Sequence, residues 1–215
     1  MKSSGTAGIE SAQGKLPGSP SLSDLPGSLR GQLPPAEEPQ PGAAQLRRAA
    51  VLVLFIPSTE GWMIPLIRRP DNQRRHPGQI ALPGGVIEAG DGSLAATALR
   101  ESWEEIGVPP ERVEVLGRLP AVVVSVSGFE VHPFVGRLDS PISLIPHDRE
   151  VAAIVKMPAS VLVDPLAVRE EPAPPGARHP TIFAFDLPEG TVWGATARIL
   201  ASLAQILRDV KASAP

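Results

Sequence analysis

The chain contains no cysteine. Disulfide bonds, thiolate nucleophiles and cysteine-ligated zinc or iron–sulfur sites are therefore excluded, and a reducing compartment is permitted. The chain also lacks an excess of positive charge: 20 Lys and Arg stand against 23 Asp and Glu, which gives a formal charge of −3 and a pI near 5.8. No basic field would attract nucleic acid or an anionic membrane, so we expect neither as a partner and expect any polyanion to be bound locally.

Long apolar runs are absent as well. The longest one, Ala49 to Ile56, is far shorter than the ~20 residues that are needed to cross a bilayer. The first residues lack the continuous apolar segment of a secretory signal, and Glu10 and Asp24 count against an acid-poor transit peptide. The sequence therefore predicts a soluble, cytoplasmic protein.

Proline, glycine and serine are concentrated at the start of the chain. Residues 1–44 contain seven of each, nearly half of the segment, which leaves too little apolar surface to offset the entropy of ordering it. We predict a flexible tail over 1–44, a folded domain over 45–210 and a short tail over 211–215. Within the first tail, Leu22 to Leu33 could dock as a short helix, although a Pro-Gly pair interrupts it.

Apolar patterning predicts the strands of the domain. Ala49–Ile56 is typical of a strand that is buried on both faces, and Trp62–Arg69 is its expected hairpin partner, with Pro65 marking an edge or a bulge. Further strands are expected at Val113–Leu119, Ala121–Val126, Val131–Leu138, Val151–Met157 and Thr181–Leu187.

The last third of the chain is predicted to contain a loop and a helix. Glu170–Pro180 is rich in proline and acids and should form a loop. Trp193 should open an amphipathic helix that runs to Leu207. Taken by itself, Trp193 is typical of a core residue.

The most informative stretch is Leu82–Val108, LPGGVIEAGDGSLAATALRESWEEIGV. Pro83, Gly84 and Gly85 predict a tight turn without side chains, which lets backbone groups approach a ligand. A helix is predicted from Leu94 to Ile106, with Ser93 as its N-cap and Gly107 as its stop.

Helical spacing at about 100° per residue divides this helix into two faces. A core face is expected to carry Ala95, Leu99, Ser102, Trp103 and Ile106. The opposite face carries Glu101, Glu104 and Glu105, whose mutual repulsion a divalent cation would reverse. Clustered oxygen donors suit Mg²⁺ or Mn²⁺ better than Zn²⁺. Arg100 could hold Glu104 at i+4, and the alternative is that the Glu-Glu pair is solvated helix surface.

The whole constellation resembles the Nudix box, a glycine and an acid followed by Arg-Glu and Glu-Glu-x-Gly. The matching positions are Gly85, Asp91, Arg100, Glu101, Glu104, Glu105, Gly107 and Val108. Asp91 replaces the usual Glu, the spacer to Arg100 has eight rather than seven residues, and Ser102 replaces a bulky apolar residue. The resemblance implies an α/β/α sandwich with a mixed β-sheet, in which the box supplies a loop and the first major helix.

Basic residues cluster ahead of the diglycine, at Arg68, Arg69, Arg74, Arg75 and His76. Such a cluster is a solvated loop in most settings, but upstream of a metal-binding helix it favours phosphate binding through guanidinium groups. Its spacing is similar to the signature of the coenzyme A pyrophosphatase subgroup, carried by Leu66, Arg69, Arg74, Gly78, Pro83, Gly84 and Gly85. Leu82 and Pro70 depart mildly from that signature. Trp193 to Ala197 resembles the subgroup's closing Trp-Gly-x-Thr-Ala element, so the match extends from about residue 48 to 208.

These residues indicate hydrolysis of a pyrophosphate. No covalent nucleophile stands in a recognisable setting, so direct attack of a metal-activated water on phosphorus is the simplest mechanism. We expect Glu101 and Glu105 to bind the metal, Glu104 to join them when a second ion binds, and the Gly85 carbonyl to contribute by resemblance. Either Glu104 or Glu150 is expected to be the general base. In Nudix proteins a glutamate from the region of Glu150 often approaches the metals.

The resemblance implies that Arg69 and Arg74 bind phosphate and that coenzyme A or an acyl derivative is cut to 3′,5′-ADP and (acyl-)4′-phosphopantetheine. Another Nudix specificity, for ADP-ribose, a nucleoside diphosphate sugar or a nucleoside triphosphate, is the first alternative. A non-catalytic module that senses nucleotides or binds a partner is the second, and the three retained acids count against it. A homodimer is a further hypothesis.

Overall fold

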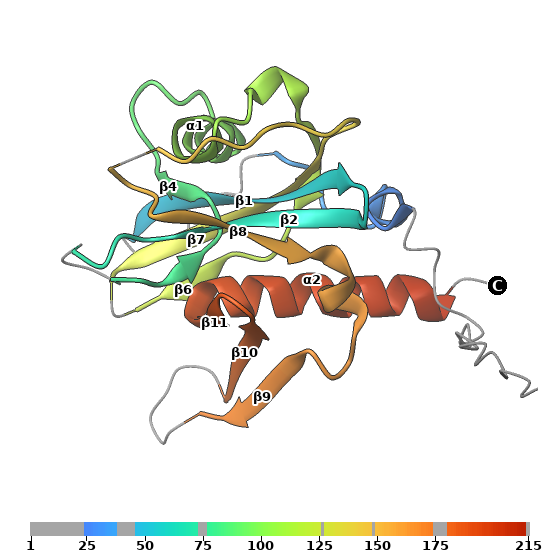
Figure 1. The fold of residues 1–215 in the computed structure, drawn as a ribbon. Coiled ribbons are helices and arrows are strands. Elements are labelled where there is room, and N and C mark those ends of the chain that lie inside the picture. The colour runs from blue at the N-terminus through green and yellow to red at the C-terminus, as the bar shows by residue number, and fades with distance from the viewer. Residues whose placement is uncertain are drawn as a thin grey trace, which may run out of the picture.

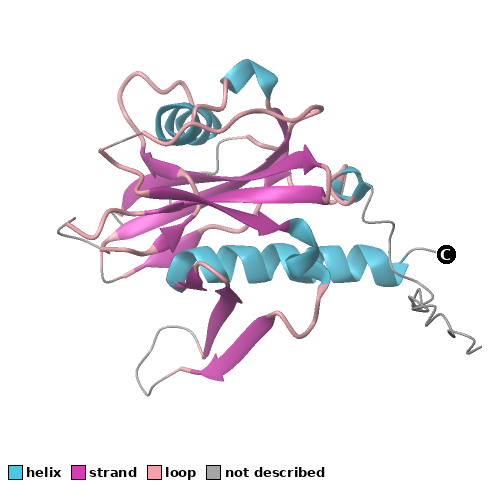
Figure 2. Ribbon diagram, in the orientation of Figure 1, coloured by secondary structure: helices cyan, strands magenta, loops and turns pink. Residues whose placement is uncertain are grey.

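The computed structural model describes residues 24–37, 46–72, 77–125, 127–147, 149–173 and 180–213. A mixed β-sheet forms the middle layer (Figure 2). Helix α1 (Leu94–Ile106) covers one face of the sheet and helix α2 (Gly194–Ser213) covers the other (Figure 1). The predicted α/β/α sandwich is confirmed.

The central sheet has eight strands, in the order β3-β2-β1-β7-β5, with β4 on β1, β6 on β7 and β8 on β2. Their bounds are β1 Arg47–Ser58, β2 Gly61–Arg68, β3 Ile80–Ala81, β4 Gly84–Val86, β5 Glu114–Arg118, β6 Val122–Val124, β7 Phe129–Arg137 and β8 Ala153–Pro158. Strands β1 and β7 run parallel, from Arg47 opposite Phe129 to Phe55 opposite Arg137, whereas the other pairs are antiparallel. The sheet is therefore mixed, as predicted.

Strand β1 is the central strand, and Leu52 to Ile56 are buried without interruption. The predicted hairpin is present, since β2 pairs with β1 from Ile56 opposite Met63 to Ser58 opposite Gly61. On one side of β2, residues 61–63 pair with β1 and residues 67–68 pair with β3. Pro65 lies between these two pairings, where the strand needs no backbone N–H donor. On the other side β8 runs along β2, with Lys156 opposite Pro65.

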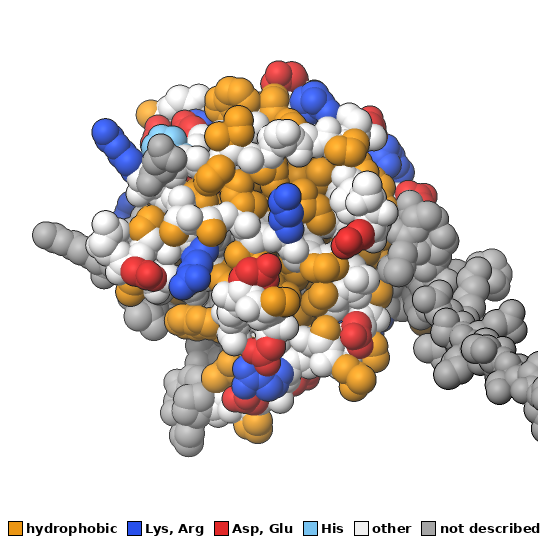
Figure 3. All heavy atoms as spheres, viewed as in Figure 1, with side chains coloured by type: hydrophobic (Ala, Val, Ile, Leu, Met, Phe, Trp, Pro, Cys, Tyr) orange, Lys and Arg blue, Asp and Glu red, His pale blue; other side chains and the backbone are white. Residues whose placement is uncertain are grey.

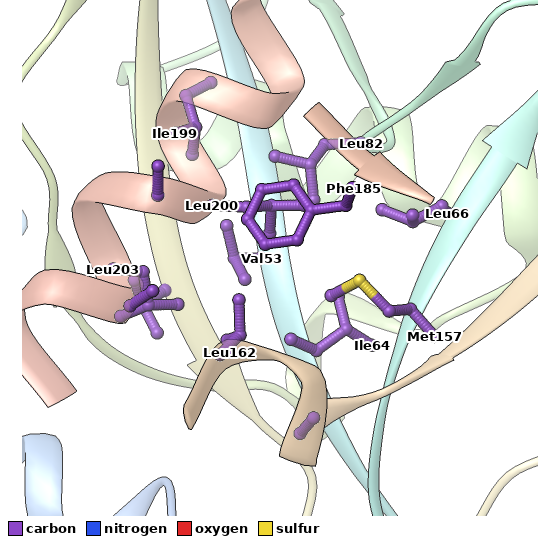
Figure 4. Packing of buried hydrophobic residues seen from close by; sticks show 14 of the residues in the cluster. Val53, Ile64, Leu66, Leu82, Met157, Leu162, Phe185, Ile199, Leu200 and Leu203 are labelled. Atoms are coloured by element: carbon purple, nitrogen blue, oxygen red, sulfur yellow. The ribbon is translucent and has the colours of Figure 1, made fainter. Parts of the chain in front are cut away.

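Two hydrophobic clusters lie on the two faces of the sheet. One cluster packs α1 against β1 through Leu94, Ala98 and Ile106. In the other, Ile199, Leu200 and Leu203 of α2 face Phe185 and the sheet residue Val53 (Figure 4). Two-sided burial of β1 explains why its sequence is a continuous apolar run rather than an alternating one.

A second sheet adjoins α2 and consists of β9 (Val168–Pro172), β10 (Thr181–Leu187) and β11 (Gly190–Trp193). The loop predicted over 170–180 is therefore wrong at its start, because β9 pairs with β10 through residue 172. Helix α2 also continues beyond Leu207 to Ser213, into the predicted C-terminal tail. Short 3-10 helices are η2 (Gly27–Leu29), η3 (Pro110–Arg112) and η4 (Ala159–Val163).

Residues 24–37, which were assigned to the flexible tail, pack against the domain. Leu25, Leu29 and Leu33 are at most 7% exposed and belong to the α2-side cluster. The Arg118 amide donates to the Pro34 carbonyl at 3.0 Å. The docking segment considered in the sequence is thus present, as a 3-10 turn. Spaced leucines provide enough apolar surface even though the composition around them is that of a tail.

The surface carries mixed charge. On the face drawn in Figure 3, Lys and Arg side chains are interspersed with Asp and Glu, without a continuous field of one sign. Among the described residues, no helix is both long enough and apolar enough to cross a membrane.

Candidate active site

Helix α1 begins and ends where the sequence predicts. The Ser93 hydroxyl oxygen accepts from the Ala96 amide at 3.1 Å, and Gly107 closes the helix in the left-handed conformation at φ 73°. The predicted faces need correction: Trp103 is 51% exposed, whereas Glu105 is only 5% exposed. The helix is therefore turned so that one edge of its acidic face lies against the sheet.

That edge meets the diglycine. The predicted turn is a bend at Pro83 followed by strand β4, in which Gly84 and Gly85 pair with Val51 and Ala50 of β1. Gly84 has φ 151°, and a Cβ there would lie 2.6 Å from the Val51 Cα atom. A Cβ at Gly85 would lie 2.7 Å from Oε2 of Glu101. The first glycine thus lets β4 reach β1, and the second leaves space for a carboxylate.

Glu105 is fixed at the end of this strand. Its Oε2 accepts from the Gly84 amide at 2.9 Å. Burial raises the pKa of the Glu105 carboxyl to about 8, and the charges of Glu101 and Glu150 act in the same direction, whereas the Gly84 amide and Arg69 oppose them. Burial likewise raises the pKa of Glu101, against the effect of Arg100. Two carboxylates therefore converge on the diglycine without enough nearby positive charge.

Arg100 organises the outer edge of the site. Its Nε and Nη2 donate to Oδ1 and Oδ2 of Asp91 at 2.8 and 3.0 Å, a bidentate pair. Its Nη1 donates to Oε2 of Glu104 at 2.8 Å, as the i+4 spacing predicts, and its Nη2 lies 3.0 Å from Oε1 of Glu101. The Arg100 guanidinium holds the pKa of Asp91 well below its usual range. Arg100 is thus a positioning residue, which binds three carboxylates of its own chain and the Val86 carbonyl of β4.

Asp91 is the residue whose role the sequence did not reveal. Its side chain is 5% exposed and accepts from the Glu88 amide and the Thr97 hydroxyl, both at 2.9 Å, in addition to Arg100. It therefore ties the loop before α1 to the helix. The spacing alone could have suggested this contact, because the acid in that loop and the arginine in the second turn of the helix both match positions of the box.

Glu150 and Arg69 approach the same point from other elements. The Glu105 carbonyl accepts from the His147 amide at 3.0 Å, and the His147 carbonyl accepts from the Glu150 amide at 3.1 Å. The exposed Glu150 side chain is close enough to raise the pKa values of Glu101 and Glu105, and Arg69 is close enough to lower that of Glu105.

The structure thus brings Glu101, Glu105, Gly84 and Gly85 together, with Arg100 behind Glu101, and Glu150 and Arg69 act on Glu105 through their charges. Glu104 lies apart, 49% exposed and paired with Arg100. Arg74 lies outside the described residues.

The donor set fits a divalent cation in part. Glu101 and Glu105 offer hard oxygen donors beside a strand whose glycines admit no side chain, and burial raises the pKa values of both carboxyls. Within the part of the chain that is described, no three acidic or histidine side chains already stand in metal-binding geometry. Glu104 is the third acid that was expected at the metal, and its carboxylate accepts a hydrogen bond from Arg100.

Comparison with known proteins finds similar sequences. The family model of the NUDIX domain matches residues 46–181. The chain is 38% identical over 193 residues to "Uncharacterized Nudix hydrolase NudL" of Pectobacterium atrosepticum, covering 87% of this chain and 95% of that protein. A protein of the same description from Photorhabdus laumondii is 36% identical over 185 residues, covering 86% and 97%.

Solved structures show the same fold. A Nudix hydrolase from M. smegmatis, RenU, aligns with a TM-score of 0.50 at 19% identity, covering 79% of this chain and 88% of that one. A MutT/nudix family protein from Enterococcus faecalis aligns with a TM-score of 0.50 at 17% identity, covering 80% and 66%. At these identities the likeness concerns the fold alone.

Proposed function

We propose a substrate for this chain, which belongs to the NUDIX domain family and is a pyrophosphohydrolase: coenzyme A or one of its acyl derivatives. The products would be 3′,5′-ADP and (acyl-)4′-phosphopantetheine. The main support for an active site here is that the carboxylates of Glu101 and Glu105 both lie against the diglycine strand. The substrate itself is supported by the arginine-bearing signature upstream of β4 and by the Trp-Gly-x-Thr-Ala element at 193–197.

Glu101, Glu105 and the Gly85 carbonyl would hold a divalent cation, and Mg²⁺ or Mn²⁺ suits these oxygen donors. When bound, such an ion lowers the pKa of water and neutralises phosphate oxygens. The hydrogen bond from the Gly84 amide fixes the Glu105 carboxylate, and Arg100 fixes Glu101. Arg69, with Arg74 from the same loop, would bind the substrate's phosphates as a fork of N–H donors.

Glu150 is our candidate for the proton acceptor. Both Glu104 and Glu150 were open to that role, but Oε2 of Glu104 is already bonded to the Arg100 guanidinium. Support for Glu150 comes from its charge, which acts on both Glu101 and Glu105, and from its exposed carboxylate, which is open to water. A Glu150→Gln variant should therefore lose more kcat than a Glu104→Gln variant.

Product analysis with coenzyme A in oxygen-18 water tests the substrate. With Mg²⁺, 3′,5′-ADP and 4′-phosphopantetheine should accumulate, and the label identifies the phosphorus that is attacked. ADP-ribose, a nucleoside diphosphate sugar and a nucleoside triphosphate form the comparison panel. Dominant turnover of one of them, with coenzyme A untouched, would move the assignment to that substrate. A cytoplasmic location and a homodimer are further parts of the proposal.

The Glu105→Gln variant tests the site independently of the substrate. A glutamine oxygen can still accept from the Gly84 amide, so the fold should be retained while kcat falls by about three orders of magnitude or more. Glu111→Gln, at an exposed acid in η3, is the matched control and should leave kcat unchanged. Near-normal turnover of Glu105→Gln at saturating Mg²⁺ would remove Glu105 from the mechanism.

A further inference from the structure

We infer that the cleft between residues 77–80 and the β10–β11 hairpin binds the nucleoside end of the substrate, with the base stacked on Trp193. The inference rests on the proposed function, because it names which end of a coenzyme A-class substrate lies there. The cleft is about 470 Å³ in volume. That is within the range of about 300–1,000 Å³ typical of small-molecule sites.

Trp193 is the aromatic wall of this cleft. In β11, Val192 is buried in the core, whereas Thr191 and Trp193 lie on the other face of the strand and line the cleft. Trp193 is 49% exposed, in a chain that has three tryptophans and no tyrosine. Exposing a large ring to water forgoes hydrophobic stabilisation that the same side chain would gain in the core. A flat partner in the cleft would recover it by stacking.

Polar groups of three kinds surround the ring. Gln79 offers an amide, and its Nε2 lies 3.6 Å from where a Cβ of Gly194 would be, beside the start of α2. Glutamine can form two hydrogen bonds with the edge of adenine. Glu189 and Thr191 offer oxygen atoms that can accept from an exocyclic amine or a ribose hydroxyl. Arg68 adds a guanidinium, which suits a phosphate on the ribose.

The cleft adjoins the candidate active site along the backbone. Arg68 lines the cleft, and the next residue along the chain is Arg69, which is proposed to bind the substrate's phosphates. The Arg69 amide donates to the carbonyl of the cleft residue Gln79 at 3.0 Å. The Ala152 amide, two residues after Glu150, donates to the Arg68 carbonyl at 2.8 Å. Because consecutive residues of a strand point to opposite faces of the sheet, a substrate whose pyrophosphate lies at Arg69 would reach the cleft by passing the edge of the sheet beside β3.

The chemistry of the walls favours the nucleoside end over the pantetheine arm. A pantetheine arm is a flexible chain, which would lose much rotational freedom on binding and offers no ring to stack. An adenine base has a flat face for Trp193 and a polar edge for Gln79, and a phosphate of 3′,5′-ADP matches Arg68. Trp193 would then set specificity through binding rather than through the chemical step.

The test compares Trp193→Leu with Trp103→Leu, which removes an equally exposed tryptophan from the outer side of α1. With coenzyme A and Mg²⁺, Trp193→Leu should raise KM roughly 5- to 150-fold, the equivalent of about 1–3 kcal/mol of stacking, with kcat changed less than threefold. Trp193→Phe should restore most of the affinity, because it keeps a ring. Trp103→Leu should match the wild type. Circular dichroism and thermal unfolding confirm that each variant is folded.

A metal-free binding measurement separates this inference from the proposed function. Tryptophan fluorescence of the wild type should be quenched by 3′,5′-ADP, and that quenching should be lost in Trp193→Leu and retained in Trp103→Leu. Quenching by 4′-phosphopantetheine instead would assign the cleft to the other end of the substrate and overturn the inference. An unchanged KM in folded Trp193→Leu would also overturn it. If the wild type cleaves only another nucleotide but 3′,5′-ADP still quenches Trp193, the proposed substrate fails and the nucleoside site stands.

Discussion

Alanine at the two neighbouring glycines of β4 should damage different properties of the protein. At Gly84 the new Cβ would lie 2.6 Å from the Val51 Cα atom, and the backbone there has φ 151°. At Gly85 the group in the way is the carboxylate of Glu101, the end of a flexible side chain. Backbone of the central strand cannot move aside, whereas a side-chain tip can. Gly84→Ala should therefore reduce stability, and Gly85→Ala should reduce activity.

The magnitudes follow from these contacts. A residue with a side chain at a positive φ costs about 1–3 kcal/mol, and overpacking in a rigid surrounding costs about 1–3 kcal/mol more. Gly84→Ala should thus lower the free energy of unfolding by roughly 2–6 kcal/mol, or Tm by about 4–24 °C for a chain of this size. Gly85→Ala should change stability by less than about 1 kcal/mol. Moving the Glu101 carboxylate by about 1 Å should cost on the order of 100-fold in kcat/KM.

Thermal and urea unfolding, with kcat/KM for the best pyrophosphate substrate, measure both effects. Gly92→Ala is the matched control, because a Cβ there would meet nothing within 4 Å, and it should leave both quantities unchanged. The reasoning would be refuted by Gly85→Ala with wild-type kcat/KM, or by Gly84→Ala with wild-type stability. Equal losses of both quantities in both variants would show that the two glycines have one structural role rather than two.

Two further predictions concern the N-terminal segment. Leu29→Ala should destabilise the fold by about 2–5 kcal/mol, because Leu29 is fully buried under α2, whereas Gln32→Ala at an exposed site should change stability by less than about 0.5 kcal/mol in urea unfolding. Hydrogen bonds from Arg137 and Arg30 lower the pKa of Glu114, so its contribution of up to about 1 kcal/mol should be fully present above roughly pH 4.3 and be lost as the pH falls through the folded-state pKa. Unfolding curves of wild type and Glu114→Gln should converge at low pH, and a gap that widens there would contradict the sign.

The strands were predictable where a local pattern reports burial on both faces. Ala49–Ile56 lies within β1, as expected for a continuous apolar run, whereas Thr181–Leu187 matches β10 although Ile182 and Asp186 are exposed. Strand β9 was missed, since Val168–Pro172 is mostly exposed and holds its place by pairing with β10. Pairing of that kind depends on the partner strand, which the local composition does not report. The burial of Leu25, Leu29 and Leu33 was likewise not predicted, because it depends on the elements they pack against and not on the composition around them.

The sequence predicted which residues belong to the site better than it predicted how they are oriented. Spacing identified Glu101, Glu105 and the diglycine, because helical and turn constraints act over a few residues. The rotation of α1 was wrong, so that Trp103 was placed inside and Glu105 outside. Hydrophobicity ranks tryptophan above glutamate at a core position, and only the hydrogen bond from the Gly84 amide explains the reversal. The same ranking predicted Trp193 to be a core residue, whereas the structure shows it exposed.

The distribution of charge within the site explains why its inner acids need a cation. Arg100 divides its charge among Asp91, Glu104 and Glu101, and Arg69 is the cation that acts on Glu105. On the inner side, Glu101, Glu105 and Glu150 thus stand against Arg69 and a share of Arg100, which leaves a net charge between about −1 and −2 when all are ionised. A pyrophosphate is itself an anion, so Coulomb repulsion would oppose its approach to that edge. One divalent ion would cancel the inner charge without freeing Glu104 from Arg100, and a second ion becomes favourable only once the substrate has brought its own negative charge.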